Sequence, residues 1–449
     1  MDISVHPPTF ADVLKSIKDP IHGQRLVEVL TLGISPAPGG KYRHSDTLRH
    51  IKPPDGLSSE EWWAGIKFAR FPARREVPLF KDKTGRSFFY TLADPVLEML
   101  QEIDRDASGR IAVADQITNP QTRDRYIQSS LIEEAITSSQ LEGASTTREK
   151  AKEMLRSGRE PLDHSEKMIV NNYRAVQLVT RLRDQPLSRD FFFTLHRTVT
   201  EGTLREGAER HYLRQPGDKI GVYDNRDHTL LHEPPPADQI LERVDALCRF
   251  ANEVQSDVFL HPVLKAIILH FWFAYDHPFI DGNGRTARAI FYWSVLSQQY
   301  WLFEFISISN IIRKAPVKYA RSFLYTETDE NDLTYFILAQ LQVIRRAIRG
   351  LYTYVERKLE EVRRVEHLLR ASLLLNHRQL ALLGHALRHP GMRYSIVSHQ
   401  TSHGITYQTA RTDLLDLAKK QLLHKTKAAR AFVFSAPPDL AERVRKLSR

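Results

Sequence analysis

The sequence predicts a mainly α-helical protein with an inserted β-hairpin, a mixed opening region and a small C-terminal domain. The first observation is helical periodicity, because apolar residues recur at i, i+3 and i+4 through most of residues 120–350. The second is one break in that pattern, where residues 219–223 and 229–232 are strand-like around a turn at 224–227. The helices expected on either side of this hairpin cover 125–141, 148–157, 164–183, 188–201 and 236–254.

Turn signals and composition divide the 449 residues into four segments. Residues 1–115 mix helix and strand, with a short hairpin around Asp82-Lys83-Thr84-Gly85. Residues 116–350 form the main helical domain, and 351–372 form a charged helical connector. Residues 373–449 form a separate C-terminal domain.

The overall composition narrows the class of protein. Hydrophobic residues make up 42% of the chain and charged residues 26%, as in ordinary globular proteins. We find no apolar run long enough for a transmembrane helix and no apolar leader at the start, so we expect no membrane partner and a cytoplasmic location. The single cysteine, Cys248, excludes an intramolecular disulfide and a cysteine zinc cluster.

Two strongly apolar helices, expected over 262–276 and 286–296, enclose a polar loop that runs from His277 to Arg288. Pro278 disfavours helical backbone at the preceding residue, so the first helix is expected to end at His277. The tripeptide Gly282-Asn283-Gly284 tolerates positive φ and can gather backbone N–H groups into an anion-binding nest. The nest opens onto a helix N-terminus, which also favours anions.

The charged side chains of this loop indicate phosphate chemistry. Arg285 and Arg288 fall on one face of the first turns of the second helix, where cations oppose the helix dipole unless an anion is bound. Asp281 supplies an oxygen ligand suited to Mg²⁺, and His277 can act as general base for a hydroxyl. We count Thr286 with the phosphate-binding residues. The alternative is a glycine-rich turn before a capped helix.

The segment from His277 to Arg288 matches the signature H-P-F-x-[D/E]-G-N-G-R-x-x-R at every defined position, and the chain thereby resembles the Fic family over about residues 120–330. The resemblance implies a helical Fic fold and a protein adenylyltransferase, which moves AMP from ATP to a Ser, Thr or Tyr hydroxyl of a target protein or of itself. It implies that His277 is the base, that Asp281 holds Mg²⁺ and that Gly282, Asn283 and Gly284 cradle phosphates. It pairs Arg285 with the β-phosphate and Arg288 with the γ-phosphate.

A second motif resembles the inhibitory helix of many Fic proteins, which has the pattern [S/T]-x-x-x-E-[G/N]. Ser138, Glu142 and Gly143 match it within the helix expected near 125–143. Ser138 and Glu142 share one helix face, and Gly143 can end the helix. The resemblance implies that Glu142 pairs with Arg288 and so competes with the γ-phosphate. The alternative is an ordinary helix end with a solvated glutamate.

The hairpin at 217–233 stands where Fic proteins carry a flap, on whose edge an extended target segment can pair as a strand. We expect Ile220, Val222 and Leu230 to hold the target, the alternative being an incidental surface hairpin. On the adenine side, the stretch from Arg313 to Ala320 departs from the family pattern, which leaves the choice of nucleotide open.

The C-terminal domain carries most of the basic excess. The chain has a net charge of +10, and residues 372–449 hold 13 Lys and Arg against 4 Asp and Glu. Helices expected at 378–388, 397–402 and 406–420, with strands at 394–396, 422–425 and 431–434, resemble a winged helix-turn-helix. Duplex DNA is the expected partner, and the alternative is a domain for dimerisation or protein binding. The expected contacts are Tyr407, Gln408 and Arg411 on the third helix and Lys425, Lys427 and Arg430 on the wing.

The sequence therefore predicts an ATP- and Mg²⁺-dependent adenylyltransferase that Glu142 inhibits. Two other readings stay open. The first is a different Fic reaction, namely transfer of UMP, GMP or phosphocholine, or hydrolytic removal of AMP. The second is a DNA-binding regulator whose Fic core only senses nucleotide. The resemblance also suggests a homodimer.

Overall fold

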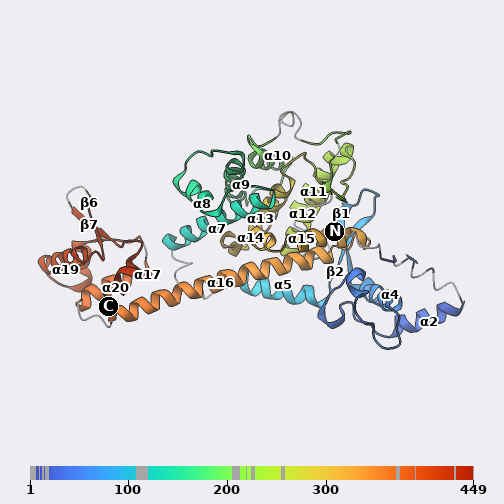
Figure 1. The fold of residues 1–449 in the computed structure, drawn as a ribbon, viewed down its shortest axis with the longest axis horizontal. Coiled ribbons are helices and arrows are strands. Elements are labelled where there is room, and N and C mark those ends of the chain that lie inside the picture. Colours follow the sequence, from blue (N-terminus) through green and yellow to red (C-terminus); the bar gives the residue numbers. More distant parts are fainter. Residues whose placement is uncertain are drawn as a thin grey trace. The chain divides into compact units, whose positions relative to one another are not determined.

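The computed structural model describes residues 7–9, 11–12, 15, 20–107, 120–204, 213–218, 220–223, 228–253, 258–370, 375–389, 391–428 and 431–447. Contacts divide the chain into two compact units, which are described separately here. The first unit takes in 1–109 and 130–348, and the second takes in 110–129 and 349–449. The fold is mainly α-helical with small sheets, as predicted, and Figure 1 shows the order of the elements.

The opening region of the first unit combines helices with one hairpin. It contains α2 (Pro20–Thr31), α3 (Ser45–Leu48), α4 (Ser59–Arg70) and α5 (Asp94–Ala107). Strands β1 (Arg74–Lys81) and β2 (Ser87–Thr91) pair antiparallel around the turn predicted at Asp82–Gly85. Helix α4 begins with a capping box between Ser58 and Glu61, which satisfies two otherwise free backbone N–H groups.

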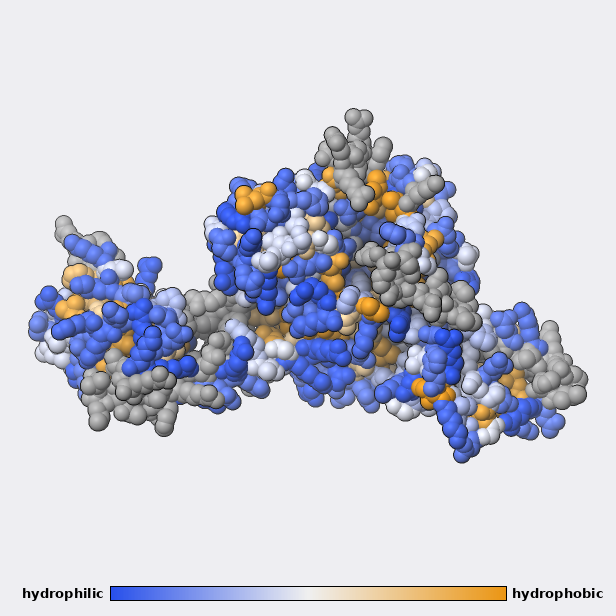
Figure 2. Space-filling model, viewed as in Figure 1, coloured by the Kyte–Doolittle hydropathy of each residue, from blue (hydrophilic) through white to orange (hydrophobic). Residues whose placement is uncertain are grey.

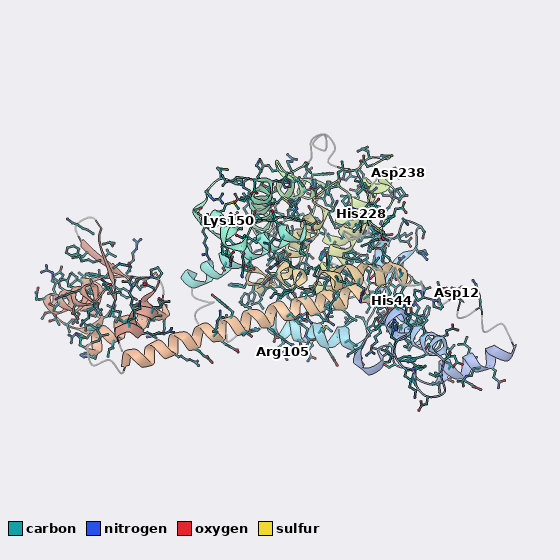
Figure 3. The ribbon with its side chains drawn as sticks, viewed as in Figure 1. Asp12, His44, Arg105, Lys150, His228 and Asp238 are labelled. Carbon is teal, nitrogen blue, oxygen red and sulfur yellow. The ribbon has the colours of Figure 1, made fainter. Side chains whose placement is uncertain are left out.

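Buried charges join this opening region to the helical domain. Lys67 of α4 is fully buried and its Nζ lies 2.6 Å from Asp329 Oδ1. Arg70 donates to the Tyr335 hydroxyl at 2.9 Å, and His44, labelled in Figure 3, stacks on Tyr325 at 4.3 Å. Because a buried charge is costly unless it is paired, these contacts fix the opening region onto the elements that follow the site.

The helical domain contains the predicted helices and two more, over 308–313 and 316–328, that the sequence did not single out. They are α7 (Pro120–Leu141), α8 (Arg148–Ser157), α9 (His164–Arg181), α10 (Arg189–Thr200), α11 (Ile240–Asn252), α12 (Pro262–Asp276), α13 (Asn283–Ser297), α14 (Ile308–Arg313), α15 (Pro316–Thr328) and α16 (Thr334–Arg370). Helices α12 and α13 form the centre, and nearly all of their side chains are buried. The segment predicted as a connector at 351–372 lies in α16 as far as Arg370.

The hairpin between α10 and α11 is shorter than predicted. Strand β3 (Val222–Tyr223) pairs antiparallel with β4 (Leu230–His232), while the predicted turn at 224–227 lies outside the described residues. We call residues 217–233 the flap. Figure 2 shows a mainly hydrophilic surface over the molecule with scattered apolar groups. None of the helices in the described ranges is long and apolar enough to cross a membrane.

The second unit has helices α17 (His377–Arg388), α18 (Ile396–His403), α19 (Tyr407–Lys419) and α20 (Leu440–Leu447) beside an antiparallel sheet of order β5-β7-β6. The strands are β5 (Arg393–Ser395), β6 (His424–Ala428) and β7 (Ala431–Ser435). The strand predicted at 422–425 begins two residues later, because Leu422 and Leu423 are buried in the core of this unit instead.

Candidate active site

The catalytic candidate His277 lies at the C-terminal end of α12. Helix α12 ends at Asp276, and His277 adopts a left-handed backbone with φ of 43°. Its N–H still donates to Phe273 O at 3.1 Å, so the turn stays hydrogen-bonded. This conformation costs a residue with a side chain roughly 1–2 kcal/mol, so neighbouring contacts must hold it in place. Its place at the helix end, before Pro278, is as predicted.

The imidazole of His277 is kept neutral by its surroundings. Burial lowers the pKa of His277 to about 4, and repulsion from His232 and Arg214 adds to the effect, whereas the Glu142 carboxylate opposes it. A neutral imidazole has a free lone pair at neutral pH and can accept a proton from a hydroxyl. The electrostatics of the site therefore suit a general base.

The loop after His277 is closed by Asn283. The Asn283 side chain accepts from Phe279 N at 3.0 Å and donates to Phe279 O at 2.7 Å, so its amide shapes the loop. His196 of α10 stacks on Phe279 at 3.5 Å, and its Nε2 lies 2.9 Å from Asp281 O. Burial lowers the pKa of His196 to about 4, so the ring is neutral and donates that hydrogen bond.

The predicted anion nest is present in altered form. Gly282 has φ of 82°, but Asn283 and Gly284 begin α13 with helical backbone. A Cβ on Gly282 would lie 2.6 Å from Thr200, so the loop passes close to α10. Thr286 is buried and its hydroxyl donates to Gly282 O at 2.9 Å, so the hydroxyl hydrogen is already bonded at the start of the helix. The feature suited to an anion is thus the α13 N-terminus preceded by one left-handed glycine.

Arg285 is nearly completely buried in the first turn of α13. It donates to Val199 O at 3.0 Å, and its NH2 lies 3.8 Å from Asp281 Oδ2, while its buried Nε has no hydrogen-bond partner among the residues that the structure describes. Burial lowers the pKa of Arg285, because the charged form loses its hydration. A buried guanidinium with an unused donor is the arrangement that an added anion would relieve.

Arg288, one turn further along α13, is held by the predicted inhibitory motif. Its Nε donates to Ser138 Oγ at 2.8 Å, and its NH2 donates to Ser138 O at 3.0 Å and to Glu142 Oε1 at 2.8 Å. Burial opposes the charge on Glu142, yet the Arg288 guanidinium outweighs it and lowers the pKa of the Glu142 carboxyl. About a third of the Glu142 side chain, 33%, stays exposed, so this pair is open to competition from solvent.

The Glu142 carboxylate occupies the predicted phosphate position. A Cβ built on Gly284 would lie 2.1 Å from Glu142 Oε1, so the carboxylate rests directly on the first turn of α13. Gly143 follows with φ of 96°, and Ala144 N donates to Ser139 O at 3.0 Å, which ends α7 just before the carboxylate. The protein's own anion therefore lies where the free N–H groups of α13 favour one.

The residues present fit a bound Mg²⁺ that is shared with a nucleotide. The Asp281 side chain is half exposed, at 51%; its Oδ1 accepts from Gly282 N at 2.6 Å, and its Oδ2 lies 3.8 Å from Arg285 NH2, beyond hydrogen-bond distance. A group of three or more acidic, histidine or cysteine ligands is not found among the described residues. Mg²⁺ commonly binds through one or two carboxylates plus substrate phosphates, so a single aspartate suffices here.

The predicted target-docking residues lie on the flap. Val222 and Leu230 are exposed and belong to paired strands, and Ile220 is half-buried just before β3. In the second unit, Tyr407, Gln408 and Arg411 are exposed on α19, and Lys425 and Lys427 are exposed on β6. Arg430 lies outside the described residues.

Sequence reasoning missed four residues of the site. Arg214 donates to His277 O at 2.9 Å, and His232 Nε2 lies 2.7 Å from Tyr275 O. Tyr319 of α15 contacts Arg288, and its hydroxyl lies 2.9 Å from His270 Nε2. His196 is the fourth. They approach from separate elements, and no spacing in the sequence relates them to the His277 loop.

Comparisons with known proteins agree with this geometry. Residues 186–295, which include the loop from His277 to Arg288, match the family model described as "Fic/DOC family". Over 59 residues the chain is 36% identical to "Protein adenylyltransferase Fic" of Nematostella vectensis, covering 13% of this chain and 14% of that protein. It is 39% identical to the protein of the same name from Drosophila yakuba, covering 13% and 12%. The matches span about one eighth of the length of these relatives.

A solved structure shows the same fold. The crystal structure of a Fic family protein from Desulfovibrio desulfuricans G20 aligns with a TM-score of 0.51 at 18% identity, covering 80% of this chain and 99% of that one. At this identity the likeness establishes the fold, and the chemistry has to be argued from the site itself.

Proposed function

The chain carries a Fic domain, and from this premise we propose that it transfers AMP from ATP to a Ser, Thr or Tyr hydroxyl of a protein, itself included. The observation that carries the proposal is the meeting of two features at one loop. A neutral, half-buried His277 follows α12, and α13 begins with an end suited to an anion, which carries two buried arginines. A base beside a phosphate-binding helix end suits attack of a hydroxyl on a phosphate.

In the proposed reaction His277 accepts the proton of the target hydroxyl, and the oxygen forms a bond to the α-phosphorus of ATP. The bond from that phosphorus to the β-phosphate oxygen breaks, and pyrophosphate leaves. Asp281 would hold Mg²⁺, which supplies positive charge to the phosphates. Arg285 binds the β-phosphate and Arg288 the γ-phosphate, so both arginines gain the anionic partner that the α13 N-terminus favours.

The contact between Glu142 and Arg288 supports the further proposal that this activity is autoinhibited. Glu142 lies on the turn that the phosphates need, and its carboxylate uses the guanidinium assigned to the γ-phosphate. ATP can bind productively only after this carboxylate moves. The flap, with exposed Val222 and Leu230, would add a target segment as a further strand.

The test is incubation of three full-length proteins, namely the parent, Glu142→Gly and His277→Ala in the Glu142→Gly background, with α-labelled ATP, UTP or GTP or with CDP-choline, followed by intact mass measurement. We expect the AMP adduct on Glu142→Gly, and a decrease of about 10²–10⁴-fold when His277 is replaced. Adducts of UMP, GMP or phosphocholine, or hydrolysis of an AMP adduct by the parent, would indicate another Fic reaction. Absence of any adduct on Glu142→Gly would refute the transferase.

A second function, binding of duplex DNA, is supported by the second unit alone. Three helices and a sheet of order β5-β7-β6 follow the chain order of a winged helix-turn-helix, and Tyr407, Gln408 and Arg411 lie exposed near the start of its third helix. Lys425 and Lys427 are exposed on β6.

Fluorescence anisotropy of the full chain with labelled duplex DNA, as a function of salt, tests this function. We expect Lys425→Ala to reduce the slope of log affinity against log salt by about 1. Absence of salt-dependent binding would favour the alternative role in protein contacts or dimerisation, which sedimentation measures. A regulator that only senses nucleotide would keep its biological activity in His277→Ala and lose it in the wing variants.

A further inference from the structure

Four consecutive carbonyl groups at and just after the end of α12 are bound by two residues, one in the flap and one shortly before it. The last carbonyls of a helix have no partner within the helix and need one from elsewhere. Here Tyr275 O, Asp276 O, His277 O and Pro278 O each accept a hydrogen bond. The donors are Arg214 and His232, and we call this pair the α12 clamp.

Arg214 supplies three of these four hydrogen bonds. Its Nε donates to His277 O at 2.9 Å, its NH2 donates to Asp276 O at 3.1 Å, and its backbone N–H donates to Pro278 O at 3.0 Å. The same NH2 also donates to Pro235 O, just beyond the flap. The Arg214 side chain is buried and uses its fixed fork of donors to span several carbonyls, which the single ammonium of lysine cannot do.

His232 supplies the fourth hydrogen bond and ties it to another helix. Its Nε2 lies 2.7 Å from Tyr275 O and its Nδ1 lies 2.8 Å from Glu327 Oε2 on α15. Both partners are acceptors, so the two bonds form together only when both ring nitrogens carry hydrogen. His232 is also the last residue of β4 and stands opposite Val222 of β3 in the flap. The base of the flap is thereby attached to α12 and α15.

We propose that Arg214 and His232 are positioning residues that hold His277 in its left-handed backbone and fix it at a set distance from the flap on which the target segment lies. This role rests on the proposed transferase function. The hydrogen bonds of Arg214 and His232 hold both the flap and the end of α12 that carries His277. A target strand that pairs with the flap therefore lies in a fixed register with His277. None of the hydrogen bonds of the clamp among the described residues goes to Arg285 or Arg288, so we expect nucleotide binding not to depend on it.

The proposal predicts different effects on the rate of transfer and on the affinity for ATP. A loose clamp misplaces the base relative to the hydroxyl, and an error near 1 Å lowers a rate by about 10²-fold. The affinity for ATP, which depends on α13, stays the same. A clamp with a purely structural role would instead lower stability and change both quantities together, or neither.

The experiment uses full-length Glu142→Gly protein with Arg214→Lys or His232→Gln added, and Arg156→Ala as a control at an exposed arginine of α8. Glutamine can donate to one of the two partners of His232 but not to both. We measure the rate of auto-labelling at saturating ATP, the ATP concentration for half-maximal rate, and the unfolding temperature. We expect the rate to fall about 10- to 100-fold in both clamp variants, with half-saturation within about twofold and no change in the control.

Two outcomes would overturn the proposal. One is an unchanged rate in both clamp variants, and the other is a rise in half-saturation that parallels a fall in unfolding temperature. If Arg214→Lys does not fold, His232→Gln decides. Hydrogen exchange at the amides of Arg214 and His277 is measured as well, since it needs no activity. If Glu142→Gly is not labelled by any of the nucleotides, the proposed transferase function is refuted. The clamp is then tested by hydrogen exchange alone. It predicts faster exchange at the Arg214 and His277 amides in His232→Gln, and unchanged exchange would refute it.

Discussion

The C-terminal end of α12 and the N-terminal end of α13 meet at one loop, yet their polar groups are satisfied in opposite ways. At the end of α12, Arg214 and His232 bind four consecutive carbonyls. At the start of α13, the buried Nε of Arg285 finds no hydrogen-bond partner in the described part of the chain, and Arg288 is paired with the Glu142 carboxylate, which follows α7. The end of α12 has its carbonyl groups hydrogen-bonded within the chain. The start of α13 is suited to an anion, and the Glu142 carboxylate partly takes the place of that anion.

This difference has an energetic meaning. A buried donor without a partner costs about 1–3 kcal/mol, and cations at a helix N-terminus oppose its dipole. The start of α13 therefore carries unfavourable interactions that the triphosphate of ATP would remove. Its best internal substitute is Glu142, which rests on Gly284. The comparison predicts that changes at α13 alter nucleotide binding, whereas changes at α12 alter the rate of transfer.

Among changes that should raise activity, the largest effect is expected from Glu142→Gly. Removing the carboxylate frees Arg288 and the first turn of α13 for the γ-phosphate, and we expect labelling with α-labelled ATP to rise on the order of 10- to 100-fold, the equivalent of about 1.4–2.7 kcal/mol. Arg288 keeps its bonds to Ser138 Oγ and Ser138 O, so the site stays folded.

Glu133→Ala is the matched control, because Glu133 lies on the same helix and pairs with Arg148 on the surface at 2.7 Å. It should leave labelling at the parent level. Equal labelling of Glu142→Gly and the parent would contradict the inhibitory role of Glu142.

The second prediction concerns pH and the α12 end. As the proposed base, His277 would act in its neutral form, so activity should be lost as the pH falls through the pKa of His277, which burial lowers to about 4. A histidine with an ordinary pKa would be only about one-tenth neutral at pH 5.5. We therefore expect kcat/KM of the Glu142→Gly protein to fall less than about twofold between pH 7.5 and 5.5.

Removing Glu142 lowers the pKa of His277 further, since this carboxylate favours the protonated imidazole. In the Glu142→Gly protein, the loss of kcat/KM at acid pH should therefore be centred at a lower pH than the pKa of His277 in the parent. A limb centred near pH 6.5 would show that the imidazole is not desolvated in the working enzyme, and the assignment of the base would need revision.

Local sequence patterns predict the loop from His277 to Gly284 better than they predict the residues that reach it from distant elements. Pro278 and the run from Gly282 to Gly284 act through their own backbone, so the helix end at His277 and the anion site at α13 follow from neighbouring residues. The resemblance to a known motif also implied that Glu142 pairs with Arg288, and the structure shows that contact, while the inhibitory role stays a prediction.

The missed residues act over long distances in the chain. Arg214 reaches His277 from 63 positions away, and His232 joins α12 to Glu327, 95 positions further on. No periodicity connects such partners, because only tertiary packing brings them together. Asn283 shows a different limit. Its place in the motif implied a phosphate contact, which stays a prediction, and did not reveal that its side-chain amide closes the loop on Phe279.

The smallest change is expected from Gly284→Ala, and it distinguishes displacement of Glu142 from release of the site. A Cβ at residue 284 would lie 2.1 Å from Glu142 Oε1 and 3.2 Å from Arg288 NH1, so the carboxylate has to move. The new methyl group then takes part of the space that a phosphate needs, and the helical backbone at residue 284 imposes no strain of its own, since its φ is not positive. We expect Gly284→Ala to leave labelling within about twofold of the parent, because displacing one anion without admitting the next gives no activation. In the Glu142→Gly background the same methyl group should raise the ATP concentration for half-maximal rate and leave the rate at saturation nearly unchanged. Strong activation by Gly284→Ala alone would show that the phosphates do not rest on this turn of α13, and would place them elsewhere along the loop.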